Sequence, residues 1–520
     1  QQGALVMKWK TQIISALIHA AVLLACFGVL FLLVRLTVPD REQRSSGPAQ
    51  ETSQEAESRE TETETEAESG TESLAEGEGE ESREEYFTKG YGYDAWETVL
   101  EDMWTPPKEE PYVPSTVILA TDLHYQSHQA DDRGQAFQTF VENCDGKVVE
   151  YLPELLEAFL DEVIEKEPSA LVLSGDITMN GESINHQELA ERLRRVQDAG
   201  IQVLVIPGNH DINNTNAAVY FGDEKKQTPS VTGDEFLELY YDYGYDQAFS
   251  RDETSLSYAY ALDEKNWLLM LDSAQYDPVN RVEGRIRDTT LEWMEGVLQE
   301  AEEKGVFVLP IAHHNLLSQS RMYTTQCTME NHLQVIELLE KYGCPLFLSG
   351  HLHVQRIHQY RSEPGIPQEE AGIREIVTDA LSIPPCQYGF LEWKEDGSLE
   401  YSTAAVNVSA WAAETGNENP DLLDFEDWSY RYIRELISSQ IASSIRNLGE
   451  EITWSMAGTY ASVYMDYYAG RAINKEDVRS TKGYRWWQRN LPDSPMLQEM
   501  EAMMADSDRD NNYLLIPEAL

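Results

Sequence analysis

The segment PGNHD at 207–211 follows the apolar run VLVI at 203–206, and this pair decides the fold class. A short apolar run rich in β-branched residues predicts a buried strand. Gly, Asn and His directly after it place polar side chains at a strand end, where α/β proteins bind their ligands. The same residues also form ordinary turns. The wider sequence favours a ligand site, because four other apolar runs also end in Asp or His.

Five short polar clusters each follow an apolar run. They are Asp122-Leu123-His124 after 117–120, Gly175-Asp176 after 171–173, Asn209-His210 after 203–206, His313-His314 after 306–311, and Gly350-His351-Leu352-His353 after 346–348. Residues i and i+2 of an extended chain point the same way, so the two members of each Asp-x-His or His-x-His pair are expected to converge. Adjacent residues diverge, so Asn209 and His210 are expected to differ in role, as are the two histidines at 313–314.

From Ser115 onward, short β-branched runs alternate with helical patterns, which predicts an α/β core with helices outside. Besides the five strands above, the predicted strands are 267–271 and 376–377, and the predicted helices are 152–164, 187–197, 289–303 and 331–342. Beyond about Ala410 only helical periodicity remains. We therefore expect a small helical C-terminal region whose main role is packing.

Together the clusters supply two carboxylates, one amide oxygen and several imidazoles. This mixture suits divalent Mn, Fe or Zn, because all-oxygen sites favour Mg or Ca and thiolates favour structural Zn. Two carboxylates against two divalent cations leave a local charge of about +2, which binds a phosphoryl group. A lone buried His is more often a core residue than a ligand. Five clusters in order, each at a strand end, predict a two-metal site.

The motifs Asp-x-His, Gly-Asp, Gly-Asn-His-Asp, His-His and Gly-His-x-His, in this order, resemble those of the calcineurin-like metallophosphoesterase superfamily. The resemblance covers roughly residues 115–405, and its last two motifs look like those of the cyclic-nucleotide phosphodiesterase branch, which includes exported bacterial members with a helical C-terminal extension. It implies an α/β fold, a four-layer α/β/β/α sandwich with the site at the carboxyl ends of the strands. It also implies the metal ligands: Asp122, His124 and His353 for one ion, Asn209, His313 and His351 for the other, and Asp176 bridging both with a hydroxide that acts as the nucleophile.

The resemblance also implies roles for residues beside the ligands. His210 would stabilise the phosphoryl oxygen or protonate the leaving oxygen. His314 would support the ligands without binding metal. Thr178, Asn180 and Arg133 are candidates for lining the substrate pocket, and the Arg133 guanidinium would suit a phosphate. Ordinary hydrogen bonding within a loop is an equal alternative for each of these three.

The N-terminal part predicts a membrane anchor and a spacer. Residues 13–34 form an apolar run of 22 residues interrupted only by one Ser and one His, which is long enough to span a membrane. A cleaved signal, or a lipidation site at Cys26, is the alternative. Residues 36–85, rich in Glu, Ser, Thr and Gly, predict a disordered linker. The predicted domains are an anchor (1–35), the linker (36–85), an ordered lead-in (86–114), the metallophosphoesterase domain (115–408) and a helical C-terminal domain (409–520).

Charge and cysteine content exclude other classes of protein. The formal net charge of −53 argues against a nucleic-acid partner and against docking on an anionic membrane surface, because phosphates attract Lys and Arg. Fifteen Glu and two Arg between 51 and 85 supply part of this charge. The cysteines outside the apolar run show no zinc-type spacing and are too few for a disulfide framework, although the sequence leaves one bridge open among Cys144, Cys327, Cys344 and Cys386.

The sequence therefore predicts a single-pass protein of the cell membrane whose catalytic domain lies outside the cytoplasm and hydrolyses a small-molecule phosphoester with two divalent ions. A phosphodiesterase of the cyclic-nucleotide type is the first expectation. Export puts intracellular messengers out of reach, so extracellular nucleotides, glycerophosphodiesters, wall polymers and lipid head groups are alternative substrates. A phosphomonoesterase is the alternative enzyme. A surface binding protein with structural metals is the alternative of another class, and His210 argues against it, because a structural site has no use for this residue.

Overall fold

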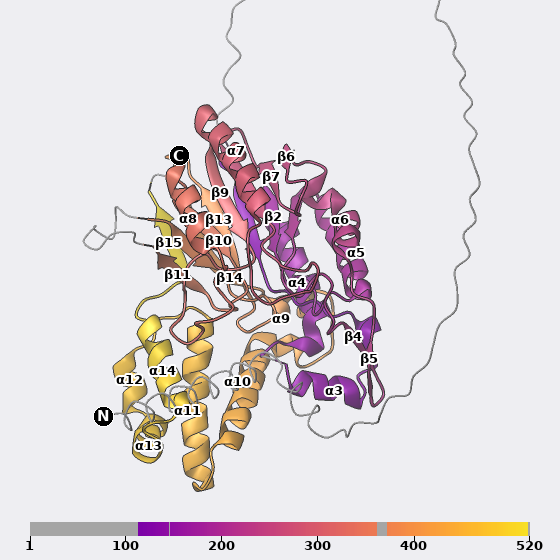
Figure 1. Ribbon diagram of the computed structural model, residues 1–520. Coiled ribbons are helices and arrows are strands. Elements are labelled where there is room, and N and C mark those ends of the chain that lie inside the picture. The colour runs from indigo at the N-terminus through magenta and orange to yellow at the C-terminus, as the bar shows by residue number, and fades with distance from the viewer. Residues whose placement is uncertain (1–112, 145, 361–371, 518–520) are drawn as a thin grey trace, which may run out of the picture. The chain divides into compact units, whose positions relative to one another are not determined.

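The computed structural model describes residues 113–144, 146–360 and 372–517 (Figure 1). The predicted membrane span at 13–34, the acidic linker at 36–85 and nearly all of the lead-in at 86–114 lie outside these residues. Within the described ranges, no helix is both long and apolar enough to cross a membrane. The fold is therefore described from Val113 onward.

A first sheet holds three of the five predicted clusters. Its strands are β1 (Thr116–Ala120), β2 (Ala170–Ser174), β3 (Gln202–Ile206), β13 (Gln387–Trp393), β14 (Leu399–Ala405) and β15 (Tyr513–Ile516), in the spatial order β15-β14-β13-β1-β2-β3. β1, β2 and β3 run parallel, and the register pairs Leu119 with Val172 and Val172 with Leu204. The carboxyl ends of these three strands therefore lie side by side, where their polar clusters meet.

A second sheet carries the two histidine-rich clusters. Its strands are β6 (Ser250–Arg251), β7 (Tyr258–Ala261), β8 (Asn266–Leu271), β9 (Phe307–Ala312), β10 (Leu346–Ser349), β11 (Arg356–Gln359) and β12 (Arg374–Val377), in the order β11-β12-β10-β9-β8-β7-β6. The Tyr258 hydroxyl of this sheet donates to the Val205 carbonyl of the first sheet at 3.2 Å, so the two sheets pack face to face. A separate hairpin consists of β4 (Ala218–Phe221) and β5 (Glu224–Gln227).

Helices flank both sheets (Figure 1). α4 (Leu152–Lys166) and α5 (Ser183–Asp198) pack on the first sheet, and α7 (Asp288–Lys304) and α8 (His332–Lys341) pack on the second. Phe159 of α4, for example, contacts Tyr388 of β13 with ring centroids 5.3 Å apart. The predicted α/β fold is confirmed. The remaining helical elements before residue 400 are η2 (His128–Ala130), α3 (Gln135–Glu142), η3 (Val149–Tyr151), α6 (Gly233–Leu239) and η4 (Tyr241–Tyr245).

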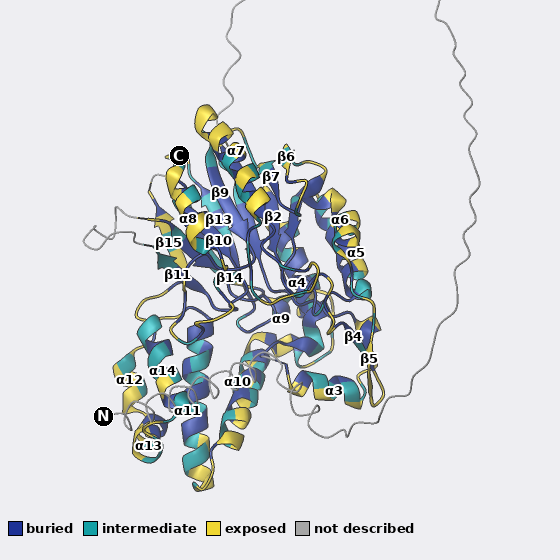
Figure 2. Ribbon diagram, in the orientation of Figure 1, coloured by how far each residue is buried: buried dark blue, intermediate teal, exposed yellow. Residues whose placement is uncertain are grey.

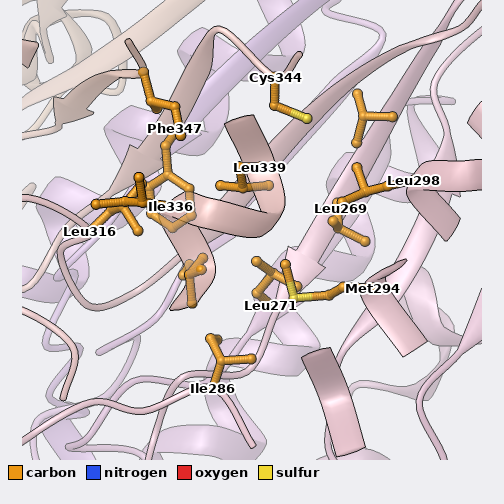
Figure 3. Packing of buried hydrophobic residues seen from close by; sticks show 14 of the residues in the cluster. Leu269, Leu271, Ile286, Met294, Leu298, Leu316, Ile336, Leu339, Cys344 and Phe347 are labelled. Carbon is orange, nitrogen blue, oxygen red and sulfur yellow. The ribbon is translucent and has the colours of Figure 1, made fainter. Parts of the chain in front are cut away.

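An apolar core fixes the second sheet beneath α7 and α8 (Figure 3). Leu271 of β8 packs near Met294 of α7, and Phe347 of β10 packs near Ile336 and Leu339 of α8. Each such side chain contributes about 1.5–3 kcal/mol when it is fully buried. The buried strands and the exposed outer faces of these helices are visible in Figure 2. This packing holds rigid the strands that carry the histidine clusters.

The C-terminal region is helical and then returns to the first sheet. Its helices are α9 (Val408–Glu414), η5 (Leu422–Asp424), α10 (Phe425–Ser444), α11 (Glu450–Tyr468), α12 (Lys475–Ser480), α13 (Lys482–Asn490) and α14 (Pro495–Asp506). Helical periodicity predicted this region, but the prediction is wrong at its end. Residues 513–516 form β15, which pairs antiparallel with β14. A strand of four residues on a sheet edge is too short for its pattern to be recognised.

All four described cysteines are buried and free: Cys144, Cys327, Cys344 and Cys386. The bridge that the sequence left open is therefore absent among them. Burial raises the pKa of Cys327 and of Cys344 to about 12, so both thiols stay protonated at neutral pH.

Candidate metal centre

The predicted ligands come from loops that follow β1, β2, β3, β9 and β10. Two groups have candidate ligand atoms within 4.8 Å of one another: Asp122, His124, Asp176 and His353 in the first, and His313, His314 and His351 in the second. His313 Nε2 lies 3.2 Å from Asp176 Oδ2, so the two groups adjoin. All of these residues are buried. The strand ends thus bring together side chains that are far apart in the sequence.

Asp122 uses one carboxylate oxygen for support and leaves the other unbonded. Oδ2 accepts hydrogen bonds from Thr121 Oγ1 at 2.8 Å and from the His351 backbone N–H at 2.9 Å. Oδ1 makes no hydrogen bond, although it lies 3.1 Å from His353 Nε2. Burial by itself raises the pKa of Asp122, but His353 and its neighbours outweigh burial and lower it. A buried, ionised and unbonded oxygen beside an imidazole nitrogen suits a cation bound by both.

His313 and Asp176 form the junction of the two groups. The His313 Nδ1–H donates to the Ser174 carbonyl at 3.0 Å, which leaves Nε2 directed at Asp176. Burial lowers the pKa of His313, but the Asp176 carboxylate outweighs it and raises the pKa to about 9. Burial opposes ionisation of Asp176 as well, yet His313 holds the Asp176 pKa well below its usual range. A divalent ion would replace the proton in such a pair.

His124 and His353 converge on one point. Their Nε2 atoms lie 3.1 Å apart, which directs two ring nitrogens at the same small volume. Burial, followed by the positive charge of Lys147, lowers the pKa of His124 well below its usual value. A neutral imidazole keeps its lone pair available, and the neutral form is the one that binds metal.

His351 is oriented by the segment that links β9 to α8. Its Nε2–H donates to the Gln326 carbonyl at 3.0 Å, which leaves Nδ1 free for a ligand role. Burial lowers the pKa of His351 to about 4, so its ring is neutral at neutral pH. The same segment is tied to the C-terminal helices, because the Tyr467 hydroxyl donates to Ser320 Oγ at 2.6 Å. The helical region therefore supports a segment that orients a predicted ligand.

The 207–211 segment lies against Asp176. A Cβ atom at Gly208 would come 2.2 Å from Asp176 Oδ1, so this close approach requires glycine. Asn209 is buried, and its Oδ1 has no hydrogen-bond partner among the residues that the structure describes. Asp122 Oδ1 and His313 Nε2 share this property. His124 Nδ1 is a fourth such atom among the described residues. Buried polar atoms without partners are rare, and four of them on predicted ligands fit a bound cation.

His210 is the partly exposed imidazole of the cluster. Its backbone N–H donates to Asp176 Oδ1 at 2.7 Å, and its Nδ1–H donates to the Met179 carbonyl at 2.7 Å. Nε2 lies 4.0 Å from Asp176 Oδ2 and makes no hydrogen bond with a residue that the structure describes, while the side chain is 31% exposed. The His124 and His313 side chains, in contrast, are fully buried. His210 thus offers one ring nitrogen to a ligand that enters from solvent.

The extended-chain argument for the Asp-x-His and His-x-His pairs is wrong about conformation. The four residues concerned have left-handed backbones, with φ between 45° and 65°: Asp122, His124, His351 and His353. This conformation is costly for residues that carry a Cβ atom, and it persists where the surrounding structure imposes it. His351 and His353 fall in different ligand groups, whereas Asp122 and His124 still converge, since Asp122 Oδ1 lies 3.8 Å from His124 Nε2. Tight turns, rather than strand alternation, bring them together.

His314 lies beside the ligands, but both of its ring nitrogens are engaged. Nδ1 accepts from Ser273 Oγ at 2.8 Å, and Nε2–H donates to the Val282 carbonyl at 3.0 Å. Its ring packs against Gly284, where a Cβ atom would come 2.2 Å from the ring. Although His314 is near enough to His313 to share a metal, these bonds favour a supporting role, as the sequence suggested.

The three other pocket candidates bond to groups other than the predicted ligands. Within the described part of the chain, Thr178, Asn180 and Arg133 make no hydrogen bond or ion pair with a predicted ligand. Thr178 Oγ1 donates to Asp211 Oδ1 at 2.9 Å. Arg133 lies near the surface and pairs with Asp131 at 3.4 Å. The loop hydrogen-bonding alternative accounts for what the structure shows of these three residues.

Two buried carboxylates that shape the site were not predicted from the sequence. Asp211 accepts from the Gly208 N–H at 2.8 Å and from the Thr178 N–H at 2.9 Å, which joins the loops after β2 and β3. Burial, reinforced by Asp176, raises the pKa of Asp211 to about 7. The feature of the sequence that could have identified Asp211 is its position at the end of the PGNHD segment. Glu375, within β12, accepts hydrogen bonds from the backbone N–H groups of Leu316 and Leu317 and from Ser349 Oγ, at 2.6–2.7 Å.

Family models match both parts of this architecture. The model described as calcineurin-like phosphoesterase matches residues 115–355. The chain contains a calcineurin-like metallophosphoesterase domain. The resemblance drawn from the motifs is confirmed for this domain. The model described as the C-terminal domain of cyclic nucleotide phosphodiesterase matches residues 407–510, which are the helical region.

Individual relatives are distant. A probable cyclic nucleotide phosphodiesterase of Ruthia magnifica subsp. Calyptogena magnifica is 37% identical over 65 residues, or 12% of this chain and 26% of that protein, so the match spans about a quarter of the relative. A dimetal phosphatase structure from Danio rerio is 14% identical and covers 56% of this chain and 96% of its own, with a TM-score of 0.40. A purple acid phosphatase structure from yellow lupin is 13% identical and covers 57% and 52%, with a TM-score of 0.35.

Proposed function

We propose that the metallophosphoesterase domain hydrolyses phosphodiesters and that cyclic nucleotides are its substrate class. The observation that carries the proposal is the match of residues 407–510 to the C-terminal domain of cyclic nucleotide phosphodiesterase, next to a domain that holds the His/Asp cluster. The name of the Ruthia magnifica relative supports the same class. The proposed activity therefore rests on the two regions together.

The proposed ligands divide between two ions: Asp122, His124 and His353 for one, Asn209, His313 and His351 for the other, and Asp176 for both. Two divalent ions held by these residues, whether Mn, Fe or Zn, would neutralise phosphoryl oxygens and activate water as the nucleophile. Asp176 suits the shared position because its pKa lies well below the usual range, so it stays ionised. The carbonyl of Ser174 keeps the His313 ring turned toward it.

In this proposal, His210 protonates the leaving oxygen. The Met179 carbonyl fixes the ring through Nδ1–H, so Nε2 is the nitrogen that carries the transferable proton. Because the side chain is 31% exposed, Nε2 can meet an oxygen of a substrate that enters from solvent. A site that held metals only for structure would not need this imidazole.

We also propose that residues 13–34 anchor the protein in the cell membrane with the catalytic domain on the outer side. The support is the length of the apolar run and the acidic linker that follows it. Protease added to intact cells should then release the catalytic domain. Release only after lysis would contradict this orientation.

The activity is tested on the purified full chain with added Mn²⁺. We expect faster hydrolysis of bis(p-nitrophenyl) phosphate than of p-nitrophenyl phosphate, complete loss with EDTA, and turnover of 3′,5′-cyclic nucleotides. The Asp176→Asn variant, prepared in parallel, controls for contaminating phosphatases. Preference for the monoester would identify a phosphomonoesterase. No turnover of either compound, with metal bound, would favour the binding-protein alternative.

A further inference from the structure

Lys147 is buried and has no partner among the residues that the structure describes. Lys147 is only 6% exposed. It forms no hydrogen bond or ion pair with any residue that the structure describes. Buried lysines are almost always paired, because an isolated ammonium loses its hydration. The chain is rich in carboxylates, with 92 Asp and Glu against 39 Lys and Arg. Burial without a partner among the described residues is the environment expected of a lysine that receives an anion from a ligand.

The backbone next to Lys147 is fixed to the first metal-ligand loop. The Val148 N–H donates to the Ser382 carbonyl at 2.9 Å, and Ser382 Oγ donates to the Asp122 carbonyl at 2.8 Å. Only one residue, Ser382, therefore separates this backbone from that of Asp122. Both hydrogen bonds are buried, so the fold fixes the position of this backbone relative to the loop that carries Asp122.

The ammonium charge acts on the cluster. After burial, Lys147 lowers the pKa of His124 more than any other group does. Its effect exceeds that of His210, whose ring centroid lies 4.8 Å from that of His124. The loop to which the Lys147 segment is bonded through Ser382 also carries His124, whose ring lies beside that of the partly exposed His210.

The C-terminal helical region holds the other side of this segment. At Gly146 the backbone is left-handed, with φ +81°, and a Cβ atom there would lie 3.6 Å from Ile433 of α10. Further on, the Tyr151 hydroxyl donates to Asp421 at 2.8 Å, and the Tyr151 ring lies 4.9 Å from that of Trp428. In Figure 1, α10 lies beside the chain that links α3 to α4. The segment that carries Lys147 therefore packs between the loop that carries Asp122 and helix α10.

We propose that Lys147 binds a non-bridging oxygen of the phosphoryl group at the metal centre, and that the C-terminal region positions it there. The proposal deepens the proposed function and rests on it for the identity of the anion. A lysine is a compact charge that pairs well with phosphate, and a cation fixed in a dry site stabilises charge that develops on phosphoryl oxygens. The helical region then has a role in catalysis without contributing a residue to the chemistry.

The test compares Lys147→Met with Lys147→Arg in the full, Mn²⁺-loaded chain. Calorimetry measures the binding of inorganic phosphate, and elemental analysis measures the bound metal. We expect Lys147→Met to weaken phosphate binding by about 10- to 100-fold with no loss of metal, and Lys147→Arg to restore most of the affinity. Lys226→Met, which removes the same charge from an exposed ion pair with Glu224, should leave phosphate binding unchanged.

Equal phosphate affinity in Lys147→Met and the wild type would overturn the proposal, and so would a loss of affinity that follows a loss of metal. If the Met variant does not fold, Lys147→Gln provides the same comparison with a polar side chain. Phosphate binding that depends on Lys147 in a wild type that hydrolyses no ester would contradict the proposed function and leave the role of Lys147 supported. The two proposals can therefore fail separately.

Discussion

Replacing Asp176 with Asn is expected to lower kcat/KM for a phosphodiester by about 10³-fold or more. Single groups that stabilise transition-state charge contribute on the order of 10²–10³-fold, and this carboxylate would serve both ions. The amide keeps the shape of the side chain but removes the negative charge that His313 maintains by holding the Asp176 pKa low. We also expect the bound metal, measured by elemental analysis, to fall below two ions per chain.

The matched control for this variant is Asp252→Asn. Asp252 is also buried, and it accepts a hydrogen bond from Ser255 at 2.6 Å, in a loop that carries no predicted ligand. This change should lower stability while leaving the metal content and the activity per folded molecule intact. An Asp176→Asn enzyme that retains two ions and wild-type turnover would contradict the role given to this carboxylate.

Replacing His210 with Ala is expected to lower kcat by about 10²-fold or more without loss of metal, because general acids contribute on the order of 10²–10⁴-fold. The effect should depend on the leaving group. A diester that releases nitrophenolate hardly needs a proton, whereas one that releases an alkoxide does. The ratio of wild-type to variant kcat should therefore be larger for a cyclic nucleotide than for bis(p-nitrophenyl) phosphate.

His332→Ala is the matched control, since His332 is also partly exposed and its Nδ1–H also donates to a backbone carbonyl, that of Met329, at 3.0 Å. It should leave both rates unchanged. Equal losses for the two leaving groups in His210→Ala would show that His210 stabilises the phosphoryl oxygen instead of protonating the leaving oxygen. Unchanged rates for both would remove His210 from the chemistry altogether.

The strands that carry the site were predictable because their environment is uniform. Runs such as 171–173 are buried on both faces between parallel neighbours and helices, so they are continuously apolar and end abruptly where polar residues begin. The same transition located the ligand loops. Eight strands were missed: β4 to β7, β11, β13, β14 and β15. β4 to β7, β11 and β15 have too few residues to establish a period. β13 and β14 are longer, but Gly389 and Glu392 in β13 and Glu400 and Ser402 in β14 interrupt their apolar character.

The supports of the site could not be predicted, because they depend on contacts distant in sequence. Glu375 bonds the backbone of Leu316 and Leu317, 59 and 58 residues away, and nothing local distinguishes it from a surface Glu on a strand. The contacts of the residues beside Lys147 are similar, since Ser382 bonds Val148 and Ile433 lies beside Gly146 only in the folded chain. Sequence patterns therefore located the residues proposed to carry the chemistry, and the tertiary structure was needed to find those that hold them in place.

The most direct test of the two-metal centre is anomalous scattering from crystals of the full chain loaded with Mn²⁺. We predict two peaks roughly 3.5–4 Å apart, both in contact with the Asp176 carboxylate. One should lie beside His124 and His353, and the other beside His313 and His351. A chain that binds no ion, or a single ion that does not contact Asp176, would contradict the account.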